Sequence, residues 1–130
     1  IGPKDVEKGT VALARRDKPG KEGKTFVSQE GLTDTVKNLL IDVQASLLQR
    51  ATEYRDANIH NVDNYEDLKK VVQDGWALSY WCESTECEKK VKEDSKATTR
   101  NIPFNQAEGE GKCVVCGKPS KRKVYFAKAY

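Results

Sequence analysis

The chain has 130 residues, with 37% hydrophobic residues and 23 lysines and arginines against 20 aspartates and glutamates, which gives a formal net charge of +3. This length suffices for one or two small domains, but no apolar run approaches the roughly 20 residues of a membrane-spanning helix and no signal-like segment opens the chain. The composition therefore disfavours membrane and secretory proteins, and the opening Ile-Gly-Pro-Lys-Asp indicates a fragment of something longer.

The first part of the chain predicts turns and one strand. Turn-forming pairs stand at residues 2–3 and 8–9. Residues 10–16 alternate in the way that a half-buried strand does. The charged segment 17–24 is rich in proline and glycine, so it is either a hairpin loop or the edge of a domain.

Two helices are predicted in the middle of the chain. From Ser28 to Asn58, apolar residues recur every three or four positions, which predicts a long helix with one apolar face. A second helix is predicted to begin at Asp63 as N-cap, with Glu66 at the acidic N3 position, and to end at Gly75.

The remaining elements are shorter. Residues 76–81 alternate large and small side chains, which predicts a strand, and a charged helix is expected at 86–94. A strand at 98–104, a polar loop at 105–112 and a last strand at 123–128 complete the pattern. Helices and strands mixed in this way predict an α/β fold.

The four cysteines form two closely spaced pairs. Four residues separate Cys82 from Cys87, two separate Cys113 from Cys116, and 25 lie between the pairs. This spacing is typical of tetrahedral zinc, because each pair supplies two neighbouring ligands about 2.3 Å from the metal. Four thiolates leave no open position for water, so we expect a structural site. Gly117 can adopt a positive φ and turn backbone amides toward a sulfur.

Two alternatives to zinc are considered for these cysteines. Two disulfides would need an oxidising compartment, for which the chain shows no signal segment. A redox pair at Cys113 and Cys116 would leave the other two cysteines without a role, and it predicts a reactive Cys113 of low pKa.

No catalytic motif is apparent. His60, the single histidine, lies in a polar connection and is interpreted as a solvated loop residue. Phosphate-binding loops, glycine-rich dinucleotide motifs and nucleophile elbows are absent from the sequence.

Positive charge gathers at both ends of the chain. Residues 112–130 carry six basic and no acidic side chains, and residues 1–24 carry seven basic against four acidic. Both ends could face a polyanion, and Lys4 beside Asp5 is suited to contact a phosphate and a base edge together. A solvated face with lysine-guarded sheet edges is the open alternative.

Several segments occur in an order and spacing specific to one family. They are residues 2–5, 13–17, 47–51 and 100–104, the cysteine pattern, and the ending that runs from 113–119 through 124–130. Together they resemble the C-terminal part of prolyl-tRNA synthetase, in the form with a C-terminal zinc-binding extension found in archaea, eukaryotes and some bacteria. The resemblance covers nearly the whole chain.

The resemblance implies a domain division and a set of site residues. Residues 1–27 would close an α/β anticodon-binding domain, and residues 28–130 would form a small α/β zinc-binding domain with a three-stranded or similar sheet. By similarity Lys4, Asp5 and Lys24 would lie at the anticodon. The family's zinc ligands match Cys82, Cys87, Cys113 and Cys116. Tyr130 matches a terminal tyrosine whose carboxylate approaches the active site.

The implied function is that of a ligase, proline-tRNA ligase, which attaches proline to tRNA(Pro) with ATP. The motifs that bind ATP and Mg²⁺ lie upstream, so no catalytic residue is expected in this chain. The full-length enzyme is expected to be cytoplasmic and a homodimer through its catalytic domains. The alternative is a free-standing zinc-stabilised module that binds RNA or another protein without catalysis.

Overall fold

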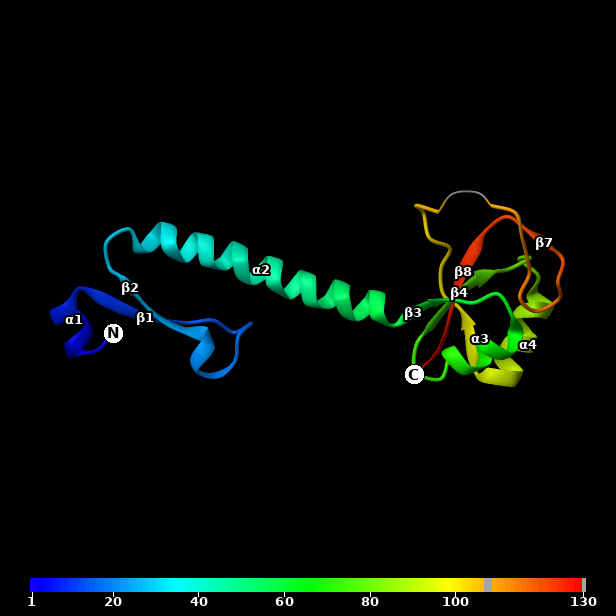
Figure 1. Cartoon of the computed structure of the whole chain (residues 1–130), viewed down its shortest axis with the longest axis horizontal. Coiled ribbons are helices and arrows are strands. Elements are labelled where there is room, and N and C mark those ends of the chain that lie inside the picture. The colour runs from blue at the N-terminus through cyan, green and yellow to red at the C-terminus, as the bar shows by residue number, and fades with distance from the viewer. Residues whose placement is uncertain (107–108, 130) are drawn as a thin grey trace. The chain divides into compact units, whose positions relative to one another are not determined.

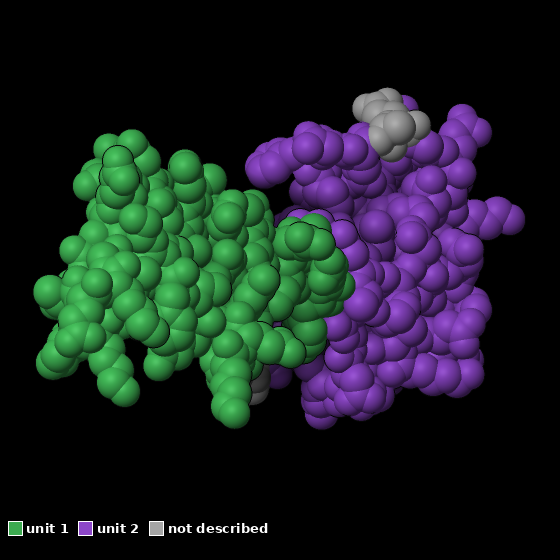
Figure 2. All heavy atoms as spheres, turned by 60° about the vertical axis from the view of Figure 1, so that its left-hand side comes forward, with its two compact units in different colours: residues 1–54 green, residues 55–130 purple. Residues whose placement is uncertain are grey.

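The computed structural model describes residues 1–106 and 109–129. The chain divides into two compact units, residues 1–54 and residues 55–130, which are coloured separately in Figure 2. Helices and strands alternate along both units, and the predicted α/β class is confirmed.

Unit 1 consists of a short helix, a hairpin and most of a long helix (Figure 1). Its elements are α1 (Pro3–Lys8), β1 (Thr10–Ala14), the 3-10 turn η1 (Gly20–Gly23), β2 (Lys24–Ser28) and the greater part of α2 (Leu32–Ala57).

A helix, α1, occupies the segment that the sequence predicts as two turns. Pro3 opens it at a position where a missing amide hydrogen costs nothing. The backbone amide of Gly2 donates to the carboxylate of Asp5 at 2.8 Å, and Gly9 ends the helix with a φ of 60°. The pairs at residues 2–3 and 8–9 are therefore the two caps of one helix.

The charged segment after β1 is a hairpin connection. β1 and β2 pair antiparallel, with Val11 opposite Val27 and Ala12 opposite Phe26. Within the connection the guanidinium of Arg15 donates to both carboxylate oxygens of Asp17, at 3.0 and 2.8 Å. Asp17 is buried.

The long helix begins four residues later than predicted. Ser28 is the last residue of β2, and Gly31, with a φ of 67°, separates strand from helix before Leu32. The apolar side chains that face the hairpin are only half-buried, and no residue of α2 is fully buried.

Unit 2 has a four-stranded sheet in the order β3-β4-β8-β5. β3 pairs parallel with β4, and β8 pairs antiparallel with both β4 and β5. The bounds of these strands are β3 (Ile59–Asn61), β4 (Trp76–Tyr80), β5 (Ala97–Thr99) and β8 (Lys123–Lys128). The last strand is confirmed at its predicted bounds, whereas the strand predicted at 98–104 ends at Thr99.

Two helices cover one face of this sheet. They are α3 (Tyr65–Val71) and α4 (Thr85–Ser95). Leu68 of α3 and Val91 of α4 pack against Phe126 of β8, and all three are fully buried. Asn64, not Asp63, caps α3, because its side chain accepts the amide hydrogen of Asp67.

Three elements of unit 2 were not predicted. β3 contains His60, which is exposed on a strand and not in a loop. β6 (Gly111–Lys112) and β7 (Pro119–Ser120) are strands of two residues each that pair as a hairpin. The connection between them carries the second cysteine pair.

Candidate metal centre

The four cysteines come from three places in unit 2 and meet at one point. Cys82 follows β4, Cys87 lies in the first turn of α4, and Cys113 and Cys116 lie in the turn between β6 and β7. Their Sγ atoms all lie within 4.8 Å of one another. The sulfur of Cys82 is 3.6 Å from that of Cys87 and 3.6 Å from that of Cys116.

These separations fit a single metal ion better than disulfides. A tetrahedron of sulfurs about 2.3 Å from a central ion has edges of roughly 3.8 Å, whereas a disulfide brings its sulfurs to about 2.05 Å. All four cysteines are free thiols. The group could therefore hold one tetrahedral metal ion.

The turn that carries Cys113 and Cys116 is fixed by backbone hydrogen bonds. The amide of Cys113 donates to the carbonyl of Lys118 at 2.8 Å, and the amide of Gly117 donates to the carbonyl of Cys113 at 2.8 Å. Gly117 has a φ of 72°, as its place after the second pair predicts. The turn is thus closed without help from the metal.

Two further contacts join this turn to the strand that leads to Cys82. The amide of Val114 donates to the carbonyl of Tyr80 at 3.0 Å, and the hydroxyl of Ser120 donates to the carbonyl of Trp81 at 2.6 Å. Gly111 packs directly on the ring of Tyr80, where a Cβ would lie 2.2 Å from Cδ2. These contacts join the end of β4, which leads to Cys82, to the turn that carries Cys113 and Cys116.

The electrostatic surroundings differ among the thiols. A hydrogen bond from the backbone of Lys118 lowers the pKa of Cys116 to about 7. Burial raises the pKa of Cys87. Burial also raises the pKa of Cys82, although a hydrogen bond from the backbone of Ser84 opposes this shift. Amides of Ser84 and Lys118 that point at thiolate sulfur would disperse its charge once a cation is bound. The position of Gly117 predicts amides near sulfur in this turn, whereas the sequence gives no signal for the amide of Ser84.

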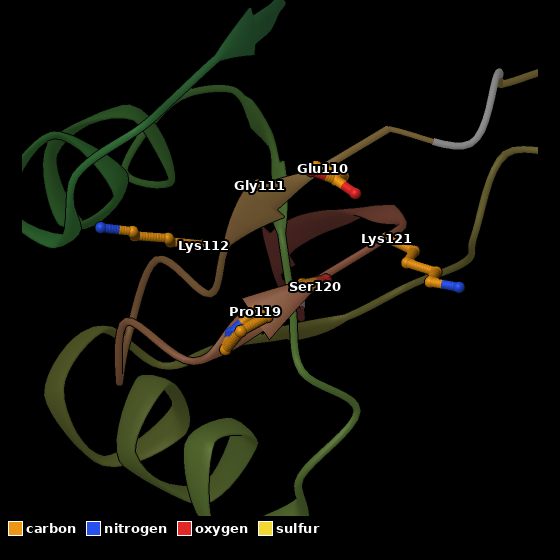
Figure 3. Close-up of a pocket in the computed structure, with 6 residues that line it drawn as sticks. All are labelled: Glu110, Gly111, Lys112, Pro119, Ser120 and Lys121. Atoms are coloured by element: carbon orange, nitrogen blue, oxygen red, sulfur yellow. The ribbon is translucent and has the colours of Figure 1, made fainter.

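A hollow of about 510 Å³ lies over the β6-β7 hairpin. It is lined by Glu110, Gly111, Lys112, Pro119, Ser120 and Lys121. In Figure 3 the side chains of Lys112 and Lys121 point away from each other at opposite ends of this hollow. These two lysines therefore do not form one cluster of positive charge in this hollow.

The predicted anticodon residues all lie in unit 1. Lys4 and Asp5 are on α1, where Lys4 is exposed and Asp5 accepts the amide hydrogen of Gly2. Lys24 pairs with Ala14, at the far end of the hairpin from the α1-β1 junction, and its ammonium lies 5.7 Å from the ring centroid of Phe26. The predicted terminal residue, Tyr130, lies outside the described residues.

Within the described part of the chain, no helix is long and apolar enough to cross a membrane.

A family model supports the resemblance seen in the sequence. The model described as "Prolyl-tRNA synthetase, C-terminal" matches residues 65–130, a stretch that includes all four cysteines.

Curated relatives match over the whole chain and carry the name proline-tRNA ligase. The chain is 48% identical over 130 residues to the protein of Roseiflexus sp. strain RS-1 and 49% identical to that of Chloroflexus aggregans. It is 39% identical over 132 residues to proline-tRNA ligase 2 of Bacillus cereus. In each case the chain spans 27% of the relative's length.

A solved structure has the same fold. The whole chain superposes, with a TM-score of 0.88 and 28% identity, on 27% of the prolyl-tRNA synthetase of Cryptosporidium parvum in its complex with halofuginone and AMPPNP.

Proposed function

The chain belongs to the prolyl-tRNA synthetase family, in the C-terminal region of those proteins, and from this membership we propose that it is the C-terminal part of a proline-tRNA ligase. The whole protein would activate proline with ATP and transfer it to tRNA(Pro). The observation that carries the proposal is the match of relatives named proline-tRNA ligase across all 130 residues.

The role proposed for unit 2 is structural. Zn²⁺ would be held by Cys82, Cys87, Cys113 and Cys116, whose sulfur separations suit it. Four thiolates fill the coordination sphere, so the ion would supply cross-linking and no reaction step. It would tie the end of β4 and the start of α4 to the β6-β7 hairpin and so brace the part of the protein that carries out catalysis.

The role proposed for the start of the chain is recognition of the anticodon. Lys4 and Asp5 would contact base edges, and Lys24 would contact the same RNA from the hairpin. Residues 1–27 would close an anticodon-binding domain, and the zinc-binding domain would follow from residue 28. Because Asp5 already accepts one hydrogen bond from Gly2, only its remaining acceptor capacity is free for a base.

Catalysis would belong to the part of the longer protein that precedes this chain. ATP, Mg²⁺ and proline would bind there, and the carboxylate of Tyr130 would approach that site. We further propose a cytoplasmic homodimer formed through the catalytic domains.

The test is proline-dependent exchange of pyrophosphate into ATP, measured on the longest native polypeptide that contains this segment. Other amino acids serve as controls, and exchange specific to proline is the expected result. Absence of exchange, or absence of any longer polypeptide, would overturn the proposal. The function would then be sought in a zinc-stabilised module that binds RNA or protein by itself.

A further inference from the structure

The four thiols of the cluster differ in their access to solvent. Cys113 and Cys87 are 2% and 7% exposed, and Cys82 is half-buried. Cys116 is the exposed member of the four. It lies in the turn between β6 and β7, and the three residues that follow it are exposed as well. A small polar molecule in solvent therefore meets this cysteine before the other three.

This exposure matters because a cysteine that binds a metal does so as a thiolate. The thiolate is also the form of cysteine that attacks peroxides. Burial keeps most structural cysteines inert, and it shields Cys87 and Cys113 here. Cys116 lacks that shield. Oxidation of the cluster is therefore expected to begin at the sulfur of Cys116.

A second thiol lies in position to complete the oxidation. The sulfur of Cys82 is 3.6 Å from that of Cys116. A disulfide has a length of about 2.05 Å, so an approach of roughly 1.6 Å would form the bond. Cys82 follows the end of β4 and Cys116 lies in a turn, so neither is held by a helix, whereas Cys87 lies in the first turn of α4.

Cys113 is less suited than Cys82 to be the partner, although it shares the turn with Cys116. Its amide donates to the carbonyl of Lys118 at 2.8 Å, and its carbonyl accepts the amide hydrogen of Gly117 at 2.8 Å. Its backbone is thus bonded on both sides, and its side chain is buried. These contacts favour Cys82 as the thiol that moves.

We propose that Cys116 is the site at which hydrogen peroxide oxidises this centre, and that Cys82 then forms a disulfide with it, so that the metal is released. The inference rests on the proposed binding of Zn²⁺ by the four thiolates. First, the sulfur of Cys116 attacks one peroxide oxygen; an S–O bond forms, the O–O bond breaks, and a sulfenic acid and a hydroxide ion result. Second, the sulfur of Cys82 attacks that of Cys116; the S–S bond forms and a second hydroxide leaves. The two sulfurs together lose two electrons, which the peroxide takes up, and both hydroxide ions are protonated to water.

Oxidation would loosen one part of unit 2 and leave another joined. Cys87 and Cys113 alone do not complete a tetrahedral site, so the ion would be lost. The new disulfide would still link the end of β4 to the β6-β7 turn, as would the hydrogen bond from the amide of Val114 to the carbonyl of Tyr80. The start of α4 would lose its link to both, while Val91, further along the helix, stays in the core.

The test exposes the longest native polypeptide, loaded with zinc, to hydrogen peroxide. Released zinc is followed with a chromogenic chelator, sulfenic acid is trapped with dimedone, and both adducts and disulfides are located by peptide mass spectrometry. We expect the first dimedone adduct on Cys116, then a disulfide between Cys82 and Cys116, with about one zinc released for each disulfide. A first adduct on another cysteine of the cluster, or a disulfide that joins any other pair, would overturn the proposal.

A pair of histidine variants tests the role of Cys116 independently. Three cysteines and one histidine also make a structural zinc site, so Cys116→His keeps four ligands but loses the oxidisable sulfur. We expect it to release zinc at least about tenfold more slowly than wild type. Lys118→His is the matched control, since Lys118 is exposed in the same turn and its replacement leaves all four thiols in place; it should release zinc at the wild-type rate. Equal rates for Cys116→His and wild type would overturn the proposal. If Cys116→His binds no zinc, the adducts and disulfides of the wild type decide.

Amide hydrogen exchange measures the structural consequence. After oxidation, exchange is expected to become faster in residues 85–91 and to stay unchanged in residues 111–120, and dithiothreitol with added zinc should reverse the effect. Equal loosening of both segments would overturn the proposal. A reduced polypeptide without zinc would overturn the metal assignment as well, whereas zinc that stays bound through the peroxide treatment would overturn this proposal alone. None of these measurements depends on proline activation.

Discussion

Substitution of Cys113 by serine is the sharpest test of the metal centre. Cys113 is 2% exposed, and its sulfur lies within 4.8 Å of the other three. Structural zinc binds to small domains with an apparent free energy of about 10–16 kcal/mol at neutral pH. A domain as a whole is stable by about 5–15 kcal/mol. Loss of one of four ligands therefore removes a contribution comparable to the entire stability of unit 2.

We expect Cys113→Ser to reduce the metal content from one zinc per chain to near zero and to abolish the cooperative melting of unit 2. Zinc is measured by elemental analysis of protein purified under reducing conditions, and melting by circular dichroism with and without a chelator. Lys118→Ala is the control. Its side chain is exposed, and its backbone amide and carbonyl, which contact Cys116 and Cys113, are unchanged.

Two results would refute the reasoning about this site. One is a wild-type protein that contains two disulfides and no metal. The other is a Cys113→Ser variant that retains one zinc and melts at the wild-type temperature. Either result would mean that the sulfur cluster is not a four-ligand centre.

Four further predictions concern other parts of the chain. Lys4→Glu is expected to weaken binding of tRNA(Pro) to the full-length protein by about tenfold in a filter-binding assay, without a change in melting temperature; unchanged affinity would remove Lys4 from the anticodon site. Deletion of Tyr130 is expected to alter the KM or kcat of proline activation more than tRNA affinity, and unchanged kinetics would leave the terminus a packing role only. Gly23→Ala should destabilise unit 1 by roughly 1–3 kcal/mol in urea titrations, because a Cβ there would lie 1.9 Å from the carbonyl oxygen of Lys18; a neutral variant would contradict this close approach. Arg15 holds the pKa of Asp17 well below its ordinary value, so this carboxylate stabilises the fold at neutral pH and the stabilisation is lost as pH falls below about 4. Asp17→Asn should remove this loss of stability at acid pH. A variant whose stability depends on pH as the wild type's does would contradict the role of Asp17.

Elements with strong local signals were predicted well from the sequence. Residues 123–128 contain four consecutive apolar or aromatic residues, 124–127, and form β8 at the predicted bounds, and β4 ends one residue before the predicted position. The cysteine spacing predicted the one group of ligands that the structure brings together in the described chain. In each case the pattern follows from burial or from ligand chemistry, and both leave a signal in the local sequence.

The missed elements depend on contacts that local sequence does not contain. β3, β6 and β7 have two or three residues each, too few for any periodicity, and they are strands only because a partner lies beside them. The helix α1 was missed because a Gly-Pro pair signals a turn as readily as it signals the first turn of a helix. Asp63 and Asn64 are both good N-cap residues, and backbone geometry alone chooses between them.

The order of strands in the sheet of unit 2 has a consequence for how the protein is made. β8 is the last strand along the chain but lies between β4 and β5, so β5 has no partner until residues 123–128 have been synthesised. Cys113 and Cys116 also leave the ribosome late, after Cys82 and Cys87 have been exposed as a lone pair. Unit 2 can therefore complete its folding only after residue 128 has been synthesised, and a nascent chain stalled before β8 would present an open strand edge to chaperones and proteases.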